Sequence, residues 1–159
     1  MKKPQESAIE SREFIMPNQL NNKNTLFGGE LVSLIDKVAS MCAQKHAQMD
    51  VVTASIDSLS FENPVYKNEH LILKAMINYT GNTSMEIGVR VETENTKTLK
   101  KIHIATAYLT FVAVDENLVP QKVPKLSPQS EEEKRRWTNA SDRVKHRKQI
   151  RKKLKTKKS

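Results

Sequence analysis

One segment with the apolar spacing of a helix, set among segments with the spacing of strands, most constrains how this chain can fold. Between residues 29 and 47 the apolar positions recur at intervals of three and four, as in a helix half-sunk in a core. The strand segments alternate apolar and polar residues, and they lie at 7–16, 51–61, 69–80, 85–95 and 101–114. Sequential strands usually pair as antiparallel neighbours. The sequence therefore predicts an α+β protein, with one helix packed on a curled antiparallel sheet of about five strands.

A single helix covers only one face of such a sheet, so the sequence also predicts an oligomer. The segment at 101–114 is too apolar to form a free edge. We expect the other face of the sheet, or its edge, to meet a second copy of the chain.

The net charge of +9 belongs to the C-terminal end of the chain. Residues 131–159 carry thirteen Lys and Arg against four Asp and Glu, whereas the rest of the chain is balanced. Ser130 and Glu133 match a capping box at the start of a helix. We therefore divide the chain into a core domain at 7–125 and a basic C-terminal helix and tail at 126–159.

The sequence also argues against several classes of protein. It has no run of about 18 apolar residues, which a transmembrane helix would need, and its N-terminus lacks the apolar core of a signal peptide. The single cysteine, Cys42, provides no disulfide framework and no metal set, and it lies on the buried stripe of the predicted helix. We expect a cytoplasmic protein with no metal and no cofactor.

Two adjacent glycines, Gly28 and Gly29, precede the predicted helix in a chain with only four glycines. They either make a tight, closely packed turn or let a ligand approach the backbone. In the second interpretation, the free N–H groups at the helix N-terminus can hold a carbonyl oxygen that becomes negatively charged. Asp36 flanks the buried stripe. It is either a surface acid paired with Lys37 or Lys45, or a partly desolvated base that accepts a proton from water.

The chain resembles the hotdog-fold acyl-CoA thioesterases, the acyl-CoA hydrolases of the cytosolic type, in four stretches. In order, these are PNQLNNKNTLFGGELVSLIDK, VVTASIDSLSFENPVY, NTSMEIGVRVETEN and ATAYLTFVAVDE. The resemblance runs from residue 9 to residue 125 and implies a hotdog fold, in which a strongly bent antiparallel sheet wraps a long central helix. It also implies a dimer whose two sheets join, and a trimer of such dimers, which is a hexamer.

The resemblance implies roles for particular residues. The family uses an asparagine before the helix and an acid within it, and these match Asn21 and Asp36. Asn21 would orient the water or the thioester, and Asp36 would act as general base or as nucleophile. The backbone N–H groups of Gly28 and Gly29 would polarise the thioester carbonyl. The site lies between subunits in the family, so Asn21 and Asp36 of one site can belong to different chains. Asn24 stands where the family usually has glycine.

A second set of residues is expected to bind coenzyme A. Asn82, Thr83 and Ser84 form a predicted turn that resembles the family's stretch near bound coenzyme A, although a plain hairpin turn also explains them. Asp57, in the stretch that resembles VTASxD, is expected to be a partnered structural acid. The basic tail is a solvated helix, a contact for coenzyme A phosphates or a membrane surface, or a nucleic-acid contact.

These features predict an acyl-CoA hydrolase that releases free fatty acid and coenzyme A. A hotdog dehydratase would need a histidine base near the start of the helix, and residues 16–45 contain none. The alternative is a non-catalytic acyl-CoA-binding hotdog module whose tail contacts nucleic acid or an anionic membrane. For the predicted hydrolase, we expect acyl-CoA and other copies of the chain as partners, with no nucleic acid and no stable membrane insertion.

Overall fold

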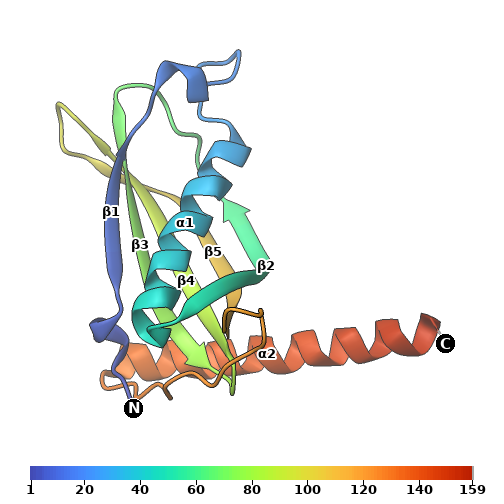
Figure 1. The fold of residues 1–159 in the computed structure, drawn as a ribbon. Helices are drawn as coiled ribbons and strands as arrows, with labels where there is room; N and C mark the ends of the chain where they lie inside the picture. Colours follow the sequence, from blue (N-terminus) through green and yellow to red (C-terminus); the bar gives the residue numbers. More distant parts are fainter. Residues whose placement is uncertain (159) are drawn as a thin grey trace.

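The computed structural model describes residues 1–158, and its central feature is one long helix wrapped by one sheet (Figure 1). The strands are β1 (Ile9–Phe14), β2 (Asp50–Phe61), β3 (Glu69–Thr80), β4 (Ser84–Asn95) and β5 (Lys101–Val114). The helices are α1 (Gly28–Ala47) and α2 (Glu131–Lys158), with short 3-10 turns at Pro4–Glu6 and Pro17–Gln19. The predicted α+β class and hotdog arrangement are confirmed.

The five strands form one antiparallel sheet in the order β1-β3-β4-β5-β2. The strands β3, β4 and β5 pair with their neighbours in sequence, as predicted. The same expectation is wrong for β1, which pairs with β3, and for β2, which pairs with β5 and forms one edge of the sheet. The connection at 62–68 crosses the end of the sheet before the chain enters β3 (Figure 1). One long side of β2 therefore faces no other strand of this chain.

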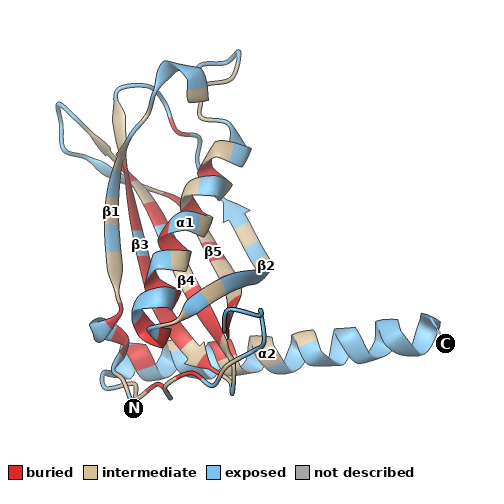
Figure 2. Cartoon of the chain, viewed as in Figure 1, coloured by how far each residue is buried: buried red, intermediate tan, exposed pale blue. Residues whose placement is uncertain are grey.

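The core lies between α1 and the concave face of the sheet, which we call the inner face (Figure 2). The predicted stripe of α1 is buried, and it includes Leu31, Ile35, Val38, Ala39 and Cys42. The sheet covers this stripe with fully buried side chains, among them Leu73, Ile77, Ile87, Leu109 and Phe111. Burial of one such aliphatic side chain stabilises the fold by about 1.5–3 kcal/mol, so this contact fixes α1 against the sheet.

The second helix, α2, packs on the opposite face of the sheet, the outer face, and then projects past the body of the protein (Figure 1). Its predicted capping box is present. The Glu133 N–H donates to Ser130 Oγ at 3.1 Å, and the Ser130 N–H donates to the Glu133 carboxylate at 3.1 Å. The helix continues to Lys158. Among the described residues, no helix is long and apolar enough to span a membrane.

Candidate active site

The N-terminus of α1 is open. The helix begins at Gly28 without a side-chain cap from Phe27, and its first turn closes with the Leu31 N–H donating to the Phe27 carbonyl oxygen at 3.2 Å. The first N–H groups of a helix have no partner within the helix. Both glycines are exposed and have ordinary backbone angles. An added Cβ at Gly28 would meet the Phe61 ring at 3.7 Å, and one at Gly29 would meet nothing within 4 Å. Contacts within residues 1–158 therefore do not require glycine here, and the tight-turn interpretation is not supported.

An apolar cavity of about 370 Å³ opens beside Gly28. Its lining includes Leu26, Leu31, Phe61, Val65 and Ile104. A larger cavity, of about 610 Å³, lies between the outer face of the sheet and α2 and is lined by none of the predicted site residues. We favour the smaller cavity as part of the active site, because it adjoins the open helix end and has the apolar lining that an acyl chain requires.

Asp36 lies on α1 and is half-buried. Its Oδ1 accepts a hydrogen bond from Thr53 Oγ1 of β2 at 2.9 Å. Among residues 1–158 no ion pair joins Asp36 to Lys37 or Lys45, so the expectation of a paired surface acid is wrong. The carboxylate is instead held toward the edge strand by a neutral hydroxyl, and Oδ2 makes no hydrogen bond within the described chain.

Asn21 caps the loop before α1. Its Oδ1 accepts from the Lys23 N–H at 2.9 Å and from the Thr25 N–H at 3.2 Å, and its Nδ2 donates to Thr25 Oγ1 at 2.8 Å. Within the described part of the chain, Asn21 and Asp36 share no hydrogen bond. Asn24 of the same loop has a φ of 59°, the left-handed angle that glycine or asparagine adopts readily. The loop thus keeps its shape without the glycine that is usual in the family.

The predicted coenzyme A turn lies at the other end of the sheet from Gly28 (Figure 1). It joins β3 to β4, with the Gly81 N–H donating to the Ser84 carbonyl oxygen at 2.8 Å. The Val123 N–H donates to the Asn82 carbonyl oxygen at 3.0 Å, and the Ala113 N–H donates to the Thr83 carbonyl oxygen at 3.1 Å. Within one chain, this turn and the open N-terminus of α1 therefore lie at opposite ends of the sheet.

Thr53 is a further candidate site residue that the sequence did not indicate. It lies in the VTASID stretch, but the search for acids and bases in that stretch selected only Asp57. Asp57 is a partnered structural acid, as expected, because Ser55 Oγ and Thr110 Oγ1 each donate to it at 2.6 Å. Thr53 is uncharged and lies two residues from another hydroxyl residue, Ser55, so its residue type does not indicate a role in the site. Only the packing of β2 against α1 distinguishes it.

Known proteins match this chain over nearly its whole length. The thioesterase superfamily model matches residues 23–100. An uncharacterized acyl-CoA thioester hydrolase of Bacillus subtilis, YkhA, is 39% identical, over 90% of this chain and 83% of its own. Protein VdlD of Helicobacter pylori is 40% identical, over 81% of this chain and 74% of its own.

Solved structures agree. A hexameric acyl-CoA thioesterase superposes with a TM-score of 0.90 at 38% identity, covering 94% of this chain and 97% of its own. An acyl-CoA hydrolase of Staphylococcus aureus, in complex with butyryl coenzyme A and coenzyme A, also has a TM-score of 0.90, at 36% identity, covering 98% of this chain and 95% of its own. Fold and sequence together define a thioesterase. Within that superfamily the chain belongs to the acyl-CoA thioester hydrolases, and it is an enzyme of that class, as the sequence predicted.

Three further structures are of S. aureus variants in which an asparagine, an aspartate or a threonine is replaced by alanine. In that protein the asparagine lies fifteen positions before the aspartate, and the threonine lies seventeen positions after it. Asn21, Asp36 and Thr53 have the same two spacings in this chain.

Proposed function

We propose that this enzyme hydrolyses acyl-CoA to a free acid and coenzyme A, and that Asp36 activates the attack on the thioester. The observation that carries the proposal is the Thr53–Asp36 hydrogen bond of 2.9 Å, on a helix whose open N-terminus adjoins an apolar cavity. The spacings of Asn21, Asp36 and Thr53 support it, because they equal those of the residues varied in the S. aureus enzyme.

In the proposed reaction, Asp36 Oδ2 takes a proton from a water molecule while the water oxygen bonds to the thioester carbonyl carbon. The carbonyl π electrons move onto the carbonyl oxygen, which becomes an oxyanion. When the oxyanion collapses, the carbon–sulfur bond breaks and the sulfur leaves as the thiolate of coenzyme A. The proton held by Asp36 then passes to the sulfur. Thr53 fixes the carboxylate through Oδ1 and leaves Oδ2 available for the proton.

The oxyanion is assigned to the backbone N–H groups of Gly28 and Gly29 of a second copy of the chain, because roughly 10–12 Å of helix, at about 1.5 Å per residue, separates these groups from Asp36 of the same chain. These groups point out of the helix N-terminus, where the helix dipole is positive. A side chain at either position would stand between the N–H groups and the substrate, which explains two glycines that contacts within the chain do not require. The acyl chain would then enter the apolar cavity beside Gly28.

Two copies of the chain are proposed to complete one site. The free edge of β2 carries exposed apolar side chains, including Val52 and Ile56, and it has no partner strand among residues 1–158. Antiparallel pairing of two β2 strands would turn the partner end for end. The partner's Asn82–Ser84 turn would then approach the end of the sheet where α1 begins, and Asn21 of one chain would act with Asp36 of the other. Three such dimers would give a hexamer, the state of a similar thioesterase.

A thiol-release assay across acyl-CoA chain lengths tests this function on the purified protein. Asp36→Asn is expected to lower kcat by about 10²–10⁴-fold, the usual cost of a lost general base, while it leaves coenzyme A affinity unchanged. Asp50→Asn, at the exposed start of β2, is the matched control and should behave as the wild type. Binding of acyl-CoA by the wild type without thiol release would indicate a non-catalytic module instead.

The same assay in ¹⁸O-labelled water separates the two ways in which a carboxylate can act. A general base never bonds to the acyl group, so a single turnover puts ¹⁸O only into the released acid. A carboxylate nucleophile would form an anhydride with the acyl group. When water attacks the Asp36 carbonyl of that anhydride, the label stays in the protein. Label in the Asp36 peptide after one turnover would therefore overturn the general-base role.

A further inference from the structure

The helix α2 crosses the outer face of the sheet strand by strand. Arg136 contacts Met76 and Trp137 contacts Tyr79, both on β3. One or more turns further along α2, its side chains contact β4 and β5, and finally the edge strand β2. These involve Arg143 with Glu86 and Tyr108, and Arg147 with Glu86 and Asp57. The helix therefore ties the middle of the sheet to the strand that carries Thr53.

Two arginines of α2 share one buried acid. Glu86 is 2% exposed, and it accepts from Arg143 Nη2 at 2.6 Å and from Arg143 Nε at 3.2 Å. Arg147 Nη1 donates at 3.3 Å to Oε2, the oxygen that Arg143 Nε also contacts, and Asn78 Nδ2 donates to Oε1 at 3.3 Å. A buried carboxylate is stable only with such partners. Arg143 contacts both Glu86 oxygens and Asn78 donates to one of them, so the second arginine has a further purpose.

That purpose is found on β2. Arg147 Nε lies 3.5 Å from Asp57 Oδ1, and the same oxygen accepts from Ser55 Oγ at 2.6 Å. The other oxygen of Asp57 accepts from Thr110 Oγ1 on β5 at 2.6 Å. The guanidinium of Arg147 thus bridges two carboxylates on different strands through two separate donors of its planar fork, Nε and Nη1.

We call the contacts of Arg147 with Glu86 and Asp57 the clamp. The clamp lies on an irregular part of β2. The ladder with β5 shifts register twice, between Thr53 and Ser55 and between Ile56 and Ser58. In each shift β2 uses one more residue than β5, so Ala54 and Asp57 are bulge residues. Strict alternation would put Thr53, Ser55, Asp57 and Leu59 on one face. The bulges instead leave Thr53 and Leu59 opposite the buried inner-face residues Phe111 and Ala107, while Ser55 and Asp57 bond on the outer face.

We infer that Asp57 and Arg147 are positioning residues for the reaction. They hold the bulged segment of β2 from the outer face, and this fixes Thr53 against Asp36 on the inner face. The inference rests on the proposed function of Asp36 and Thr53. It assigns α2 a role that its charge alone did not indicate, because the helix is fastened to the strand that orients the reacting carboxylate. Neither Asp57 nor Arg147 touches the substrate side of the sheet.

The test combines kinetics with a double-mutant cycle in the full-length protein. Arg147→Ala is expected to lower kcat about tenfold, since small displacements of a reacting group cost up to about 10²-fold, while KM stays within about twofold. Asp57→Asn should have a similar effect. Arg147→Lys should recover part of the loss, because its ammonium group reaches one of the two acids. Arg135→Ala, at an exposed position near the start of α2, is the charge-matched control and should keep the wild-type kcat.

The cycle separates positioning from a general loss of structure. In a Thr53→Ala background, Arg147→Ala should change kcat by less than about twofold, because the group that it positions is already gone. Losses that multiply in the double variant would overturn the inference. So would a wild-type kcat for Arg147→Ala in a protein whose Asp36→Asn variant is inactive. Full activity of Asp36→Asn would overturn the proposed function itself, and the positioning role with it. Circular dichroism and melting temperatures of each variant verify that the compared proteins are folded.

Discussion

Thr53 Oγ1 and Asp36 Oδ1 lie 2.9 Å apart, and their hydrogen bond joins the edge strand β2 to the middle of α1. The hydroxyl must be the donor, because an ionised carboxylate only accepts. The contact fixes the rotation of the carboxyl group at the surface where α1 meets the sheet edge. Its strength depends on two elements at once, the register of β2 and the position of α1.

Removal of the Thr53 hydroxyl is therefore expected to affect catalysis more than folding. Thr53→Ala should lower kcat by about 10–100-fold because the carboxylate is no longer held in one orientation. Thr53→Ser keeps the hydroxyl and should keep most of the activity. Thiol-release kinetics for both variants, with coenzyme A binding measured by calorimetry, check this. Equal kcat values for the alanine variant and the wild type would refute the role of Thr53.

The free edge of β2 predicts how the oligomer can be broken. Ile56 is 43% exposed on this edge strand, and we expect a partner chain to cover it. Ile56→Lys would bury an unpaired charge between two subunits, which costs several kcal/mol, and should convert the oligomer to smaller species. Leu118→Lys, at an apolar side chain that is 70% exposed in the loop after β5, is the control. Sedimentation velocity at micromolar concentration measures both, and an unchanged oligomer for Ile56→Lys would contradict pairing through β2.

Periodicity predicted the regular parts of the fold well. The bounds expected for β3 and β5 equal those observed, and the stripe of α1 is buried as expected. The facing of residues within β2 could not be predicted, because a bulge has no fixed sequence pattern and each bulge reverses the alternation after it. The pairing of β2 with β5 also depends on where α1 ends relative to the sheet, and no local sequence pattern predicts that position.

The candidate site was predictable only where residue type carries a signal. The glycine pair and Asp36 were noticed in the sequence, but their spacing left both interpretations open, and only the resemblance to the family implied roles for them and for Asn21. The role of α2 was missed, since Arg143 and Arg147 belong to a run of basic residues that resembles a solvated face. Only the three-dimensional contact with Glu86, which is buried, distinguishes those two arginines from the exposed basic residues that follow.

His46 predicts a pH dependence of stability. Burial lowers the pKa of its imidazole below the ordinary 6.5, and the hydrogen bond to the Pro124 carbonyl oxygen, at 2.8 Å, opposes this shift. The carbonyl only accepts, so Nε2 carries the proton and Nδ1 faces the Ser7 hydroxyl at 3.4 Å. Below pH 6.5 the unfolded chain binds a proton at His46 before the folded chain does, so stability falls as the pH falls toward the lowered pKa.

Urea unfolding at pH 7.5 and 5.5 measures this effect. The wild type should lose more free energy of unfolding between these two pH values than His46→Gln, which has no imidazole to protonate. The carboxylates of Glu92 and Glu133 have pKa values lowered from 4.5, so their losses begin at more acid pH and do not confound the comparison. The same loss in both proteins would exclude His46 as the origin.

Cys42 should be unreactive in the folded enzyme. Burial raises the pKa of its thiol to about 12, and the residue is fully buried in the core. Thiolate is the reactive form, so a disulfide reagent should detect no thiol in the native protein and one per chain in urea. This is also the control for the thiol-release assay, in which the reagent must report coenzyme A alone. Rapid labelling of the native protein would show that this part of the core opens.

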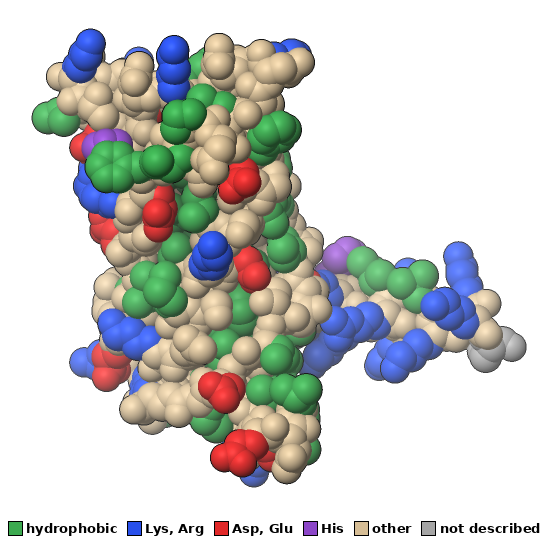
Figure 3. Space-filling view, turned by 45° about the horizontal axis from the view of Figure 1, so that its top comes forward, with side chains coloured by type: hydrophobic (Ala, Val, Ile, Leu, Met, Phe, Trp, Pro, Cys, Tyr) green, Lys and Arg blue, Asp and Glu red, His purple; other side chains and the backbone are tan. Residues whose placement is uncertain are grey.

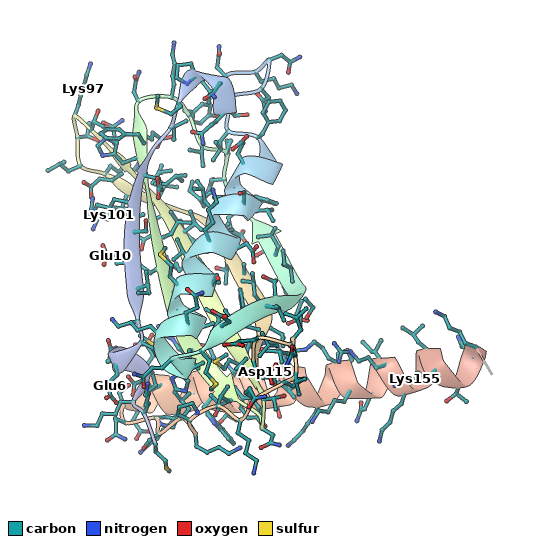
Figure 4. The ribbon with its side chains drawn as sticks, viewed as in Figure 1. Glu6, Glu10, Lys97, Lys101, Asp115 and Lys155 are labelled. Atoms are coloured by element: carbon teal, nitrogen blue, oxygen red, sulfur yellow. The ribbon has the colours of Figure 1, made fainter. Side chains whose placement is uncertain are left out.

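The exposed end of α2 is expected to capture substrate by its charge. After Lys148 the chain carries Arg151 and five lysines, none in an ion pair within the described residues, and these side chains gather on the projecting part of the helix (Figure 3). Lys155 points into solvent there, far from Lys97 and Lys101 at the other end of the sheet (Figure 4). Coenzyme A carries several phosphate charges, which such a segment attracts at long range.

The position of a C-terminal truncation decides whether it tests substrate capture alone or also the contacts of Arg143 and Arg147. Deletion of all of 131–159 would remove Arg143 and Arg147 together with the exposed end of α2. A chain ending at Lys148 keeps both arginines and loses only the exposed segment. We expect its kcat to equal that of the full-length enzyme and its KM to be several-fold higher at low salt. The chain ending at residue 130 should lose kcat as well, because the clamp on β2 is gone.

Salt separates charge capture from other effects of the truncation. Exposed charges are screened over about 8–10 Å at 0.1–0.15 M salt, so the KM of the full-length enzyme should rise with salt. The chain ending at Lys148 should show a flatter response, and the two KM values should converge at high salt. Kinetics should be measured between about 0.02 and 0.5 M salt, because the Debye length falls from about 20 Å to about 4 Å over this range. Parallel salt dependences of the two chains would mean that the exposed end of α2 has no part in substrate capture.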